Sequence, residues 1–177
     1  LNTYGYKIKY YLVDSVNKQN PLMMAARNGH VNCITTLYNI YGDHLDCNAV
    51  DKNNYNVLMI AVDYGHIHCI RLLHKIYGDK LNYTTVDNSE RHNALMIAAK
   101  NGYFNCITTL YETYGHKIDC TAITRYDREN ALMIVFKNSY TTCIKSLCSS
   151  YGGADESHPD VCWGKNLRID QVDYRNR

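Results

Sequence analysis

The chain has few prolines, no long apolar run and almost no net charge. Only 2 prolines and 10 glycines occur in 177 residues, which excludes a collagen-like or linker-like chain. Lys and Arg number 19 against 17 Asp and Glu, so charge gives no reason to expect nucleic acid or an anionic membrane as a partner. The longest apolar runs have six residues, whereas a membrane span needs about 20. With 46% apolar residues, the composition instead favours a folded chain with a buried core.

The chain also lacks the sequence motifs of the common catalytic sites. It contains no Gly-rich phosphate loop, no Gly-x-Ser-x-Gly turn and no His-Glu-x-x-His pair. We therefore expect no catalysis and no cofactor within these residues.

The most informative feature is an internal repeat of 36 or 37 residues. Each copy opens with an Asn and a short apolar run, and further positions keep the same register. The Asn positions are Asn20, Asn56, Asn93 and Asn130; the others are Cys33, Cys69, Cys106 and Cys143; Leu37, Leu73, Leu110 and Leu147; and the Tyr-Gly pairs at 41–42, 77–78, 114–115 and 151–152. Matches at this many positions predict a stack of similar structural units.

The repeats predict how the chain is divided. Tyr4 and Gly5 match the end of a copy, so residues 1–19 are expected to be the back half of an incomplete upstream repeat. Because the chain begins with Leu1, we also expect it to be a fragment or a processed product. The remaining units follow in order: repeats at 20–55, 56–92 and 93–129, an eroded C-terminal capping repeat at 130–152, and a non-repeat tail at 153–177.

Each copy has the pattern of two helices and a connector. The Asn is a good helix N-cap, and Pro21 fits the first helical position. Gly29 and its equivalents are expected to end the first helix, and Gly42 the second. Residues 43–55 are polar and predict a hairpin-like loop. One such unit cannot bury its own apolar face, so neighbouring units must stack.

In these residues the chain resembles the ankyrin repeat family. The motif Asp-x-x-Gly-x-Thr-Pro-Leu-His-x-Ala-Ala-x-x-Gly-His is similar to residues 51–66, and its second half is similar to residues 21–30. Asn replaces the capping Thr, Met replaces the His, and each repeat is longer than usual. The Trp, Gly and Tyr positions of the tetratricopeptide family are missing. The resemblance implies an all-α ankyrin-type helical repeat solenoid with extended hairpin or finger loops.

The cysteines and histidines are expected to be structural. The Cys33 column lies among apolar helix positions, and stacked helices about 8–10 Å apart are too distant for disulfides, which need Cα atoms within about 7 Å. Eight cysteines without paired spacing indicate a reducing, cytoplasmic compartment. Two possible metal sites are weaker interpretations, so we predict no metal. They are His66 with His68 and Cys69, and a zinc module of Cys143, Cys148, His158 and Cys162.

The resemblance implies that a partner is bound by the fingers and by the inward face of the first helix of each copy. On that face, one position is apolar in all four copies: Met24, Ile60, Ile97 and Ile134. This stripe is either an exposed binding site or a surface that the longer finger of the same chain folds over and buries, and the sequence leaves both open. The further candidates are Tyr64, Tyr55, Arg91 and Tyr126. The resemblance also implies that Asp51, Asp87 and Asp127 order the turns of their connectors.

These expectations combine into a functional hypothesis. The chain is a non-catalytic protein–protein interaction scaffold or adaptor, which presents a groove and finger loops to a protein partner. We expect no nucleic acid among its partners and no membrane-spanning segment. Two alternatives stay open: a structural component of a large permanent assembly, cytoskeletal or particle-associated, or the targeting arm of a larger enzyme.

Overall fold

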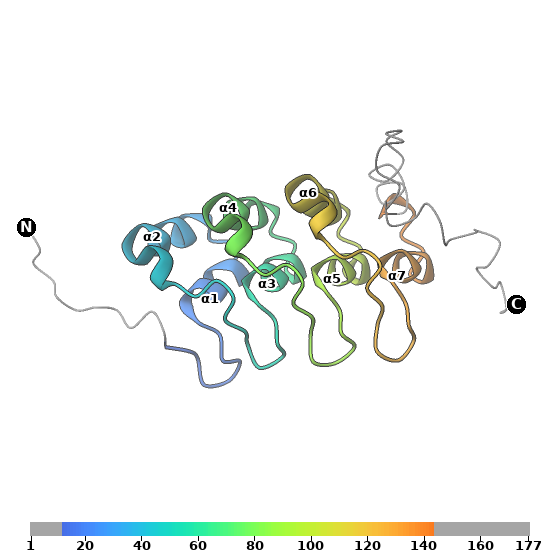
Figure 1. The fold of residues 1–177 in the computed structure, drawn as a ribbon, viewed down its shortest axis with the longest axis horizontal. Helices are drawn as coiled ribbons and strands as arrows, with labels where there is room; N and C mark the ends of the chain where they lie inside the picture. Colours follow the sequence, from blue (N-terminus) through green and yellow to red (C-terminus); the bar gives the residue numbers. More distant parts are fainter. Residues whose placement is uncertain (1–11, 144–177) are drawn as a thin grey trace, which may run out of the picture.

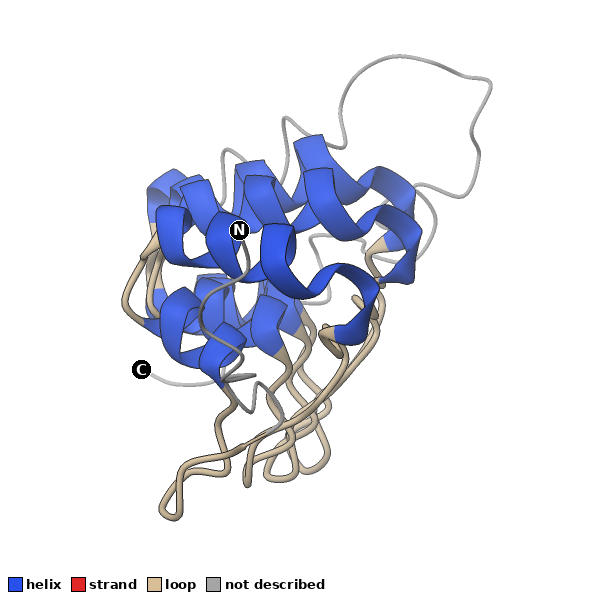
Figure 2. Ribbon diagram, turned by 90° about the vertical axis from the view of Figure 1, so that its left-hand side faces the viewer, coloured by secondary structure: helices blue, strands red, loops and turns tan. Residues whose placement is uncertain are grey.

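The computed structural model describes residues 12–143, except for the side chains of residues 43 and 116. They form a row of helix pairs in two layers, with the long loops that join one pair to the next all on one side (Figure 1; Figure 2). The inner layer contains α1 (Pro21–Arg27), α3 (Val57–Asp63), α5 (Ala94–Asn101) and α7 (Ala131–Lys137). The outer layer contains α2 (Val31–Tyr41), α4 (Ile67–Tyr77) and α6 (Phe104–Tyr114), followed by the 3-10 turns η1 (Gly42–His44), η2 (Gly78–Lys80) and η3 (Gly115–Lys117).

Each inner helix begins at its predicted Asn cap. The Asn20 side chain accepts a hydrogen bond of 2.9 Å from the Met23 N–H, and the three equivalent caps do the same. Pro21 occupies the first turn of α1, where a missing N–H costs nothing. Gly29, Gly65 and Gly102 follow the inner helices with φ between 70° and 74°, a conformation that favours glycine. The local sequence therefore sets both ends of the inner layer.

The caps also explain why Asn stands where the ankyrin motif has Thr. The amide of Asn93 donates to the carbonyl of Asp119 at 2.7 Å, and the amide of Asn56 donates to the carbonyl of Asn82. A Thr hydroxyl could cap the helix, but it is too short to make this second bond as well. One Asn thus joins the start of its own helix to the next connector.

The core lies between successive helix pairs. Inner helices contact inner helices, outer helices contact outer helices, and α1, α3 and α5 each contact the outer helix of the same repeat. Leu22, Leu58, Leu95 and Leu132 are all buried in one continuous apolar cluster. The helical solenoid predicted from the repeat is confirmed.

Two neighbouring positions on the inner helices show which way each face points. Met24 is 48% exposed, whereas its equivalents Ile60, Ile97 and Ile134 are 1%, 2% and 5% exposed. Met23, Met59 and Met96 are each 1% exposed, whereas their equivalent Met133 is 42% exposed. The first position therefore faces the preceding repeat and the second faces the following one. Each is uncovered only at one end of the described array.

This arrangement corrects the interpretation of the apolar stripe as a binding site. Ile60, Ile97 and Ile134 lie in the interfaces between repeats and are not accessible to a partner. The stripe is buried within the chain, as the second possibility had it, but by helices of the neighbouring repeats and not by the fingers. The adjacent inner helices, which contact one another, account for this burial.

The cysteine column follows the same rule. Cys69, Cys106 and Cys143 are buried, whereas Cys33 is exposed at the first end of the array; all four are free. Burial raises the pKa of the Cys69 and Cys106 thiols to about 11, so they stay protonated and pack as small apolar groups. Cys120 is not among these free cysteines, because it is disulfide-bonded. The reducing compartment stays a prediction.

Candidate functional site

Four loops, here called the fingers, project from the inner helices at residues 14–19, 51–55, 87–92 and 124–129 (Figure 2). The first residue of each finger orders its turn. Asp51 Oδ1 accepts the backbone N–H groups of Asn53 at 2.8 Å and Tyr55 at 3.0 Å. Asp14 and Asp87 accept finger N–H groups in the same way. These carboxylates face their own backbone and are turn-forming groups.

The fourth finger departs from this pattern and corrects one prediction. The Thr124 hydroxyl accepts the N–H of Glu129 at 2.9 Å, so Thr124 holds the ordering position. Asp127 lies at the exposed tip and forms an ion pair of 3.4 Å with Lys137. Asp127 therefore does not order the turn, contrary to what the family resemblance implies.

The third finger contains a buried contact between a histidine and a carboxylate. His92 Nδ1 lies 2.9 Å from Asp87 Oδ2, and both side chains are almost fully buried. Burial on its own would raise the pKa of Asp87, but the hydrogen bond and charge of His92, with donors from Ser89 and Arg91, lower it overall. The carboxylate is thus held in its charged form as the anchor of this finger.

Hydrogen bonds between adjacent fingers fix them as a row. The N–H of Lys52 donates to the carbonyl of Asn17 at 2.9 Å, and the N–H of Arg125 donates to the carbonyl of Glu90 at 2.7 Å. The middle pair is joined from Asn88 to Asn53 at 3.1 Å. Figure 1 shows the four loops side by side below the inner layer. The fingers therefore present their side chains from a common, ordered support.

The fingers and the ends of the inner helices form one surface, which we call the finger face. Lys137, at the end of α7, lies 2.9 Å from the carboxylate of Glu129 in the fourth finger. Neighbouring repeats are also linked here, because the Asn101 amide donates to Asp63 Oδ1 at 3.0 Å. The finger face is thus polar, and it is held together both within and between repeats.

Two exposed tyrosines on the finger face each lie beside an arginine. The guanidinium of Arg27 lies 5.1 Å from the centre of the Tyr64 ring, and Tyr64 is 43% exposed. The guanidinium of Arg125 lies 6.0 Å from the centre of the Tyr126 ring, and Tyr126 is 69% exposed. At these distances a cation attracts the face of an aromatic ring. Both rings are therefore oriented while remaining open to solvent.

Tyr55 and Arg91 occupy different settings. Tyr55 is half-buried and lines a polar cavity of about 430 Å³ between the second and third fingers, together with Asn53, Asp87, Asn88 and Ser89. Burial, and then the nearby charges of Asp63, Asp87 and Asp51, raise the pKa of Tyr55, so the phenol stays neutral. Arg91 is exposed at the tip of the third finger.

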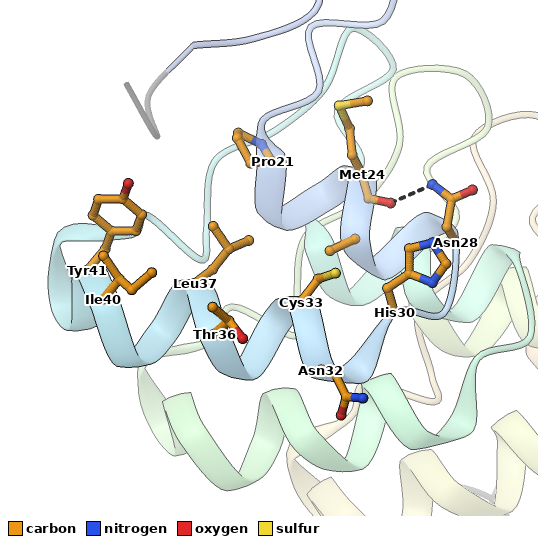
Figure 3. A pocket seen from close by; sticks show the side chains of 11 residues that line it. Pro21, Met24, Asn28, His30, Asn32, Cys33, Thr36, Leu37, Ile40 and Tyr41 are labelled. Carbon is orange, nitrogen blue, oxygen red and sulfur yellow. Dashed lines mark hydrogen bonds between the residues drawn. The ribbon is translucent and has the colours of Figure 1, made fainter. Parts of the chain in front are cut away.

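A second, apolar groove of about 570 Å³ lies at the first end of the array, between α1 and α2 (Figure 3). Met24, Cys33 and Leu37 line it, with Ile40 and Tyr41 at the end of α2. The equivalents of the first three in the second and third copies are buried between repeats. Among residues 12–143 the groove is therefore the open side of a repeat interface, a consequence of its position at the end of the described array.

The predicted metal clusters are not assembled in the part of the chain that is described. Within residues 12–143, no three His, Cys, Asp or Glu side chains converge in a way that could hold a metal ion. His66 instead contacts the carbonyl of Arg27 in the preceding repeat, with its Nε2 at 2.9 Å. Cys148, His158 and Cys162 lie outside the described residues.

Comparison with protein families agrees with the repeat geometry. The family model for ankyrin repeats (3 copies) matches residues 4–85, 22–122 and 80–160, which together cover most of the chain. The chain belongs to the ankyrin repeat family. Ankyrin repeats generally mediate protein–protein interaction and are typically non-catalytic. No curated protein matches the chain. Among residues 12–143, no helix of this ankyrin repeat protein is long and apolar enough to cross a membrane.

Sequence reasoning found some of this surface and missed the rest. It identified Tyr64, Tyr126 and Arg91, which the structure places on the exposed finger face. It missed Lys18 and Lys52 at the finger tips, although a repeat alignment places Lys18 at the position of Arg91. The pairing of arginines with tyrosines depends on side-chain placement, which the sequence pattern does not give.

Proposed function

We propose that this chain is a non-catalytic interaction scaffold that binds a protein partner through the finger face. The observation that supports it is the pair of exposed Arg–Tyr contacts, Arg27 with Tyr64 and Arg125 with Tyr126. Tyr and Arg are enriched among the residues that dominate binding energy at protein interfaces. Other finger-face candidates, Tyr55 and Arg91, would surround these two anchors.

The rigidity of the array supports the same proposal. The fingers are hydrogen-bonded to one another, and the two tyrosine rings already lie against guanidinium groups. Binding a partner then costs less conformational entropy, because fewer groups must be ordered on association. In this proposal the stacked helices hold the fingers in place, and the side chains of the polar finger face contact the partner.

The test is capture of partners by three forms of the chain from the cells that produce it. The baits are the wild type, the double variant Tyr64→Ala/Tyr126→Ala and a control, Arg71→Ala. Arg71 lies on the outer helix α4 and forms only an exposed ion pair with Glu112. We expect proteins enriched by the wild type and the control to fall at least about tenfold with the double variant. Equal enrichment by all three forms would contradict the proposal.

A second candidate is a part in a permanent assembly, in which another protein or a second copy of the chain would cover the apolar groove between α1 and α2 at the first end of the described array. Exposed apolar patches mark surfaces that another protein covers. An assembly component would co-purify in a large particle that Met24→Glu disrupts, whereas an adaptor would purify as a small soluble protein in either form. Gel filtration of both forms separates the two.

A further inference from the structure

The four finger tips share an unusual backbone conformation. Lys18, Asn54, Arg91 and Arg128 have φ values of 62°, 67°, 65° and 54°. Each lies two residues before the Asn that caps the following helix, so the four positions are equivalent. Side chains other than glycine are crowded in this left-handed region, and Asn tolerates it best. Three of the four tips nevertheless have a long cationic side chain there, although glycine would relieve the strain.

Every finger carries at least one exposed cation. The second finger is one residue shorter and has Asn54 at the strained position, but its cation is supplied by Lys52 instead. The row consists of Lys18, Lys52, Arg91, Arg125 and Arg128. Within residues 12–143 none of these five side chains forms an ion pair with a carboxylate.

The acids of the fingers are engaged elsewhere. The carboxylates of Asp14, Asp51 and Asp87 accept the N–H groups of their own turns. Asp127 and Glu129 both pair with Lys137. Of the six finger acids, only Glu90 has neither role, and it is half-buried. Apart from Asp127, which is exposed but pairs with Lys137, the exposed charges of the fingers are therefore positive.

We infer that this tip row binds an extended, carboxylate-rich segment of the protein partner, an inference that rests on the proposed function. Stacked helices lie about 8–10 Å apart, and an extended chain advances about 3.3 Å per residue. A carboxylate at every third residue would therefore meet successive fingers. The fingers hold five cations and six acids, so their summed charge is near zero. This favours short-range contacts with spaced carboxylates over the many phosphate contacts that drive nucleic-acid binding.

The strain provides a test that separates binding from folding. In the triple variant Lys18→Gly/Arg91→Gly/Arg128→Gly, three cations disappear and three strained positions are relieved. We expect the melting temperature to stay level or to rise by a few degrees, because glycine adopts this conformation readily. We expect weaker binding of an acidic peptide at the same time.

Binding is measured by fluorescence anisotropy with the whole 177-residue chain. The probe is a labelled peptide of four Glu-Ala-Ser units, and the control peptide has Gln for Glu. The wild type should prefer the Glu peptide, and the triple variant should bind it about tenfold more weakly, since each exposed ion pair contributes a small factor. Asn54→Gly makes the same backbone change without removing a charge; it also removes the hydrogen bond from the Asn54 amide to the carbonyl of Val86, and it should bind the Glu peptide normally. Lys52→Gln/Arg125→Gln removes two cations from unstrained positions and should also weaken binding.

Three results would overturn the inference: equal binding of the Glu and Gln peptides, unchanged binding by the triple variant, or tighter binding of an oligodeoxythymidylate than of the Glu peptide. If such a result appears while partner capture still depends on Tyr64 and Tyr126, only the acidic-segment inference is wrong. If capture is independent of both tyrosines, the proposed function is wrong whatever the peptide does.

Discussion

At the scale of single residues, the Asn caps make hydrogen bonds of two kinds that stabilise the fold. Their side-chain oxygens accept an N–H of the first helical turn, and the amides of Asn56 and Asn93 reach the next connector. Replacing a cap by Ala typically costs about 1 kcal/mol. Breaking the second bond adds a further contribution of about 0.5–1.5 kcal/mol. An Asn cap that makes both hydrogen bonds should therefore contribute more to the free energy of unfolding than one that makes only the first.

We predict that Asn56→Ala lowers the free energy of unfolding by about 2 kcal/mol and Asn20→Ala by about 1 kcal/mol. Asn20 caps α1 but has no hydrogen bond to a following connector among residues 12–143. Urea unfolding followed by circular dichroism measures both values. Equal losses would show that the bond from Asn56 to the connector contributes nothing to stability.

At the scale of elements, each finger depends on one ordering residue, and the third finger makes this dependence sensitive to pH. The pKa of the Asp87 carboxyl is lowered in the folded chain. A carboxyl whose folded pKa lies below its unfolded value stabilises the fold above the unfolded value, about pH 4, and this stability is lost as the pH falls through the folded pKa.

We predict that Asp87→Asn costs about 1.5–3 kcal/mol of unfolding free energy at pH 7, because it removes a charged partner of His92. The cost should shrink as the pH falls through the lowered pKa of Asp87, because the wild-type carboxyl is then itself protonated. Urea unfolding at a series of pH values gives the difference. The exposed Asp127 is the control, and Asp127→Asn should cost less than about 0.5 kcal/mol at pH 7. A cost for Asp87→Asn that does not change with pH would contradict the role of its charge.

The sequence predicted where the helices begin and end better than it predicted which of their side chains are buried. The Asn and Gly positions predicted where the inner helices begin and end, because caps and left-handed residues act locally. The same pattern could not decide whether Ile60 is exposed, since burial depends on which neighbouring repeat covers that face. Nor could it distinguish Thr124 from Asp127 as the ordering residue, because both are polar finger residues and only the hydrogen-bond geometry separates them.

At the scale of the whole molecule, successive repeats pack through helix faces that are apolar at equivalent positions. The polar finger face is left exposed, and we propose that it binds the partner. The contrast between Ile60, 1% exposed, and Met24, 48% exposed, follows from this stacking. One position on the helix is core or surface depending only on whether a preceding repeat covers it. A charged side chain should therefore strongly destabilise the fold in place of Ile60 and have little effect in place of Met24.

We predict that Ile60→Glu lowers the free energy of unfolding by more than about 4 kcal/mol, because it places an unpaired carboxylate between repeats. Met24→Glu should change it by less than about 1 kcal/mol, since that side chain reaches water. Thermal unfolding followed by circular dichroism compares the two. If both variants keep the wild-type melting temperature, the stripe is not core and becomes a candidate binding site again.

The most direct test of the central claim, that the partner binds the finger face, is side-chain oxidation of the chain with and without a captured partner. Tyr64 and Tyr126 are exposed reporters on the finger face, and the outer helices offer exposed side chains such as Arg71 for comparison. The account predicts that bound partner protects Tyr64 and Tyr126 and leaves the exposed side chains of α4 and α6 as reactive as in the free chain. Protection confined to α4 and α6, with Tyr64 and Tyr126 still reactive, would contradict it.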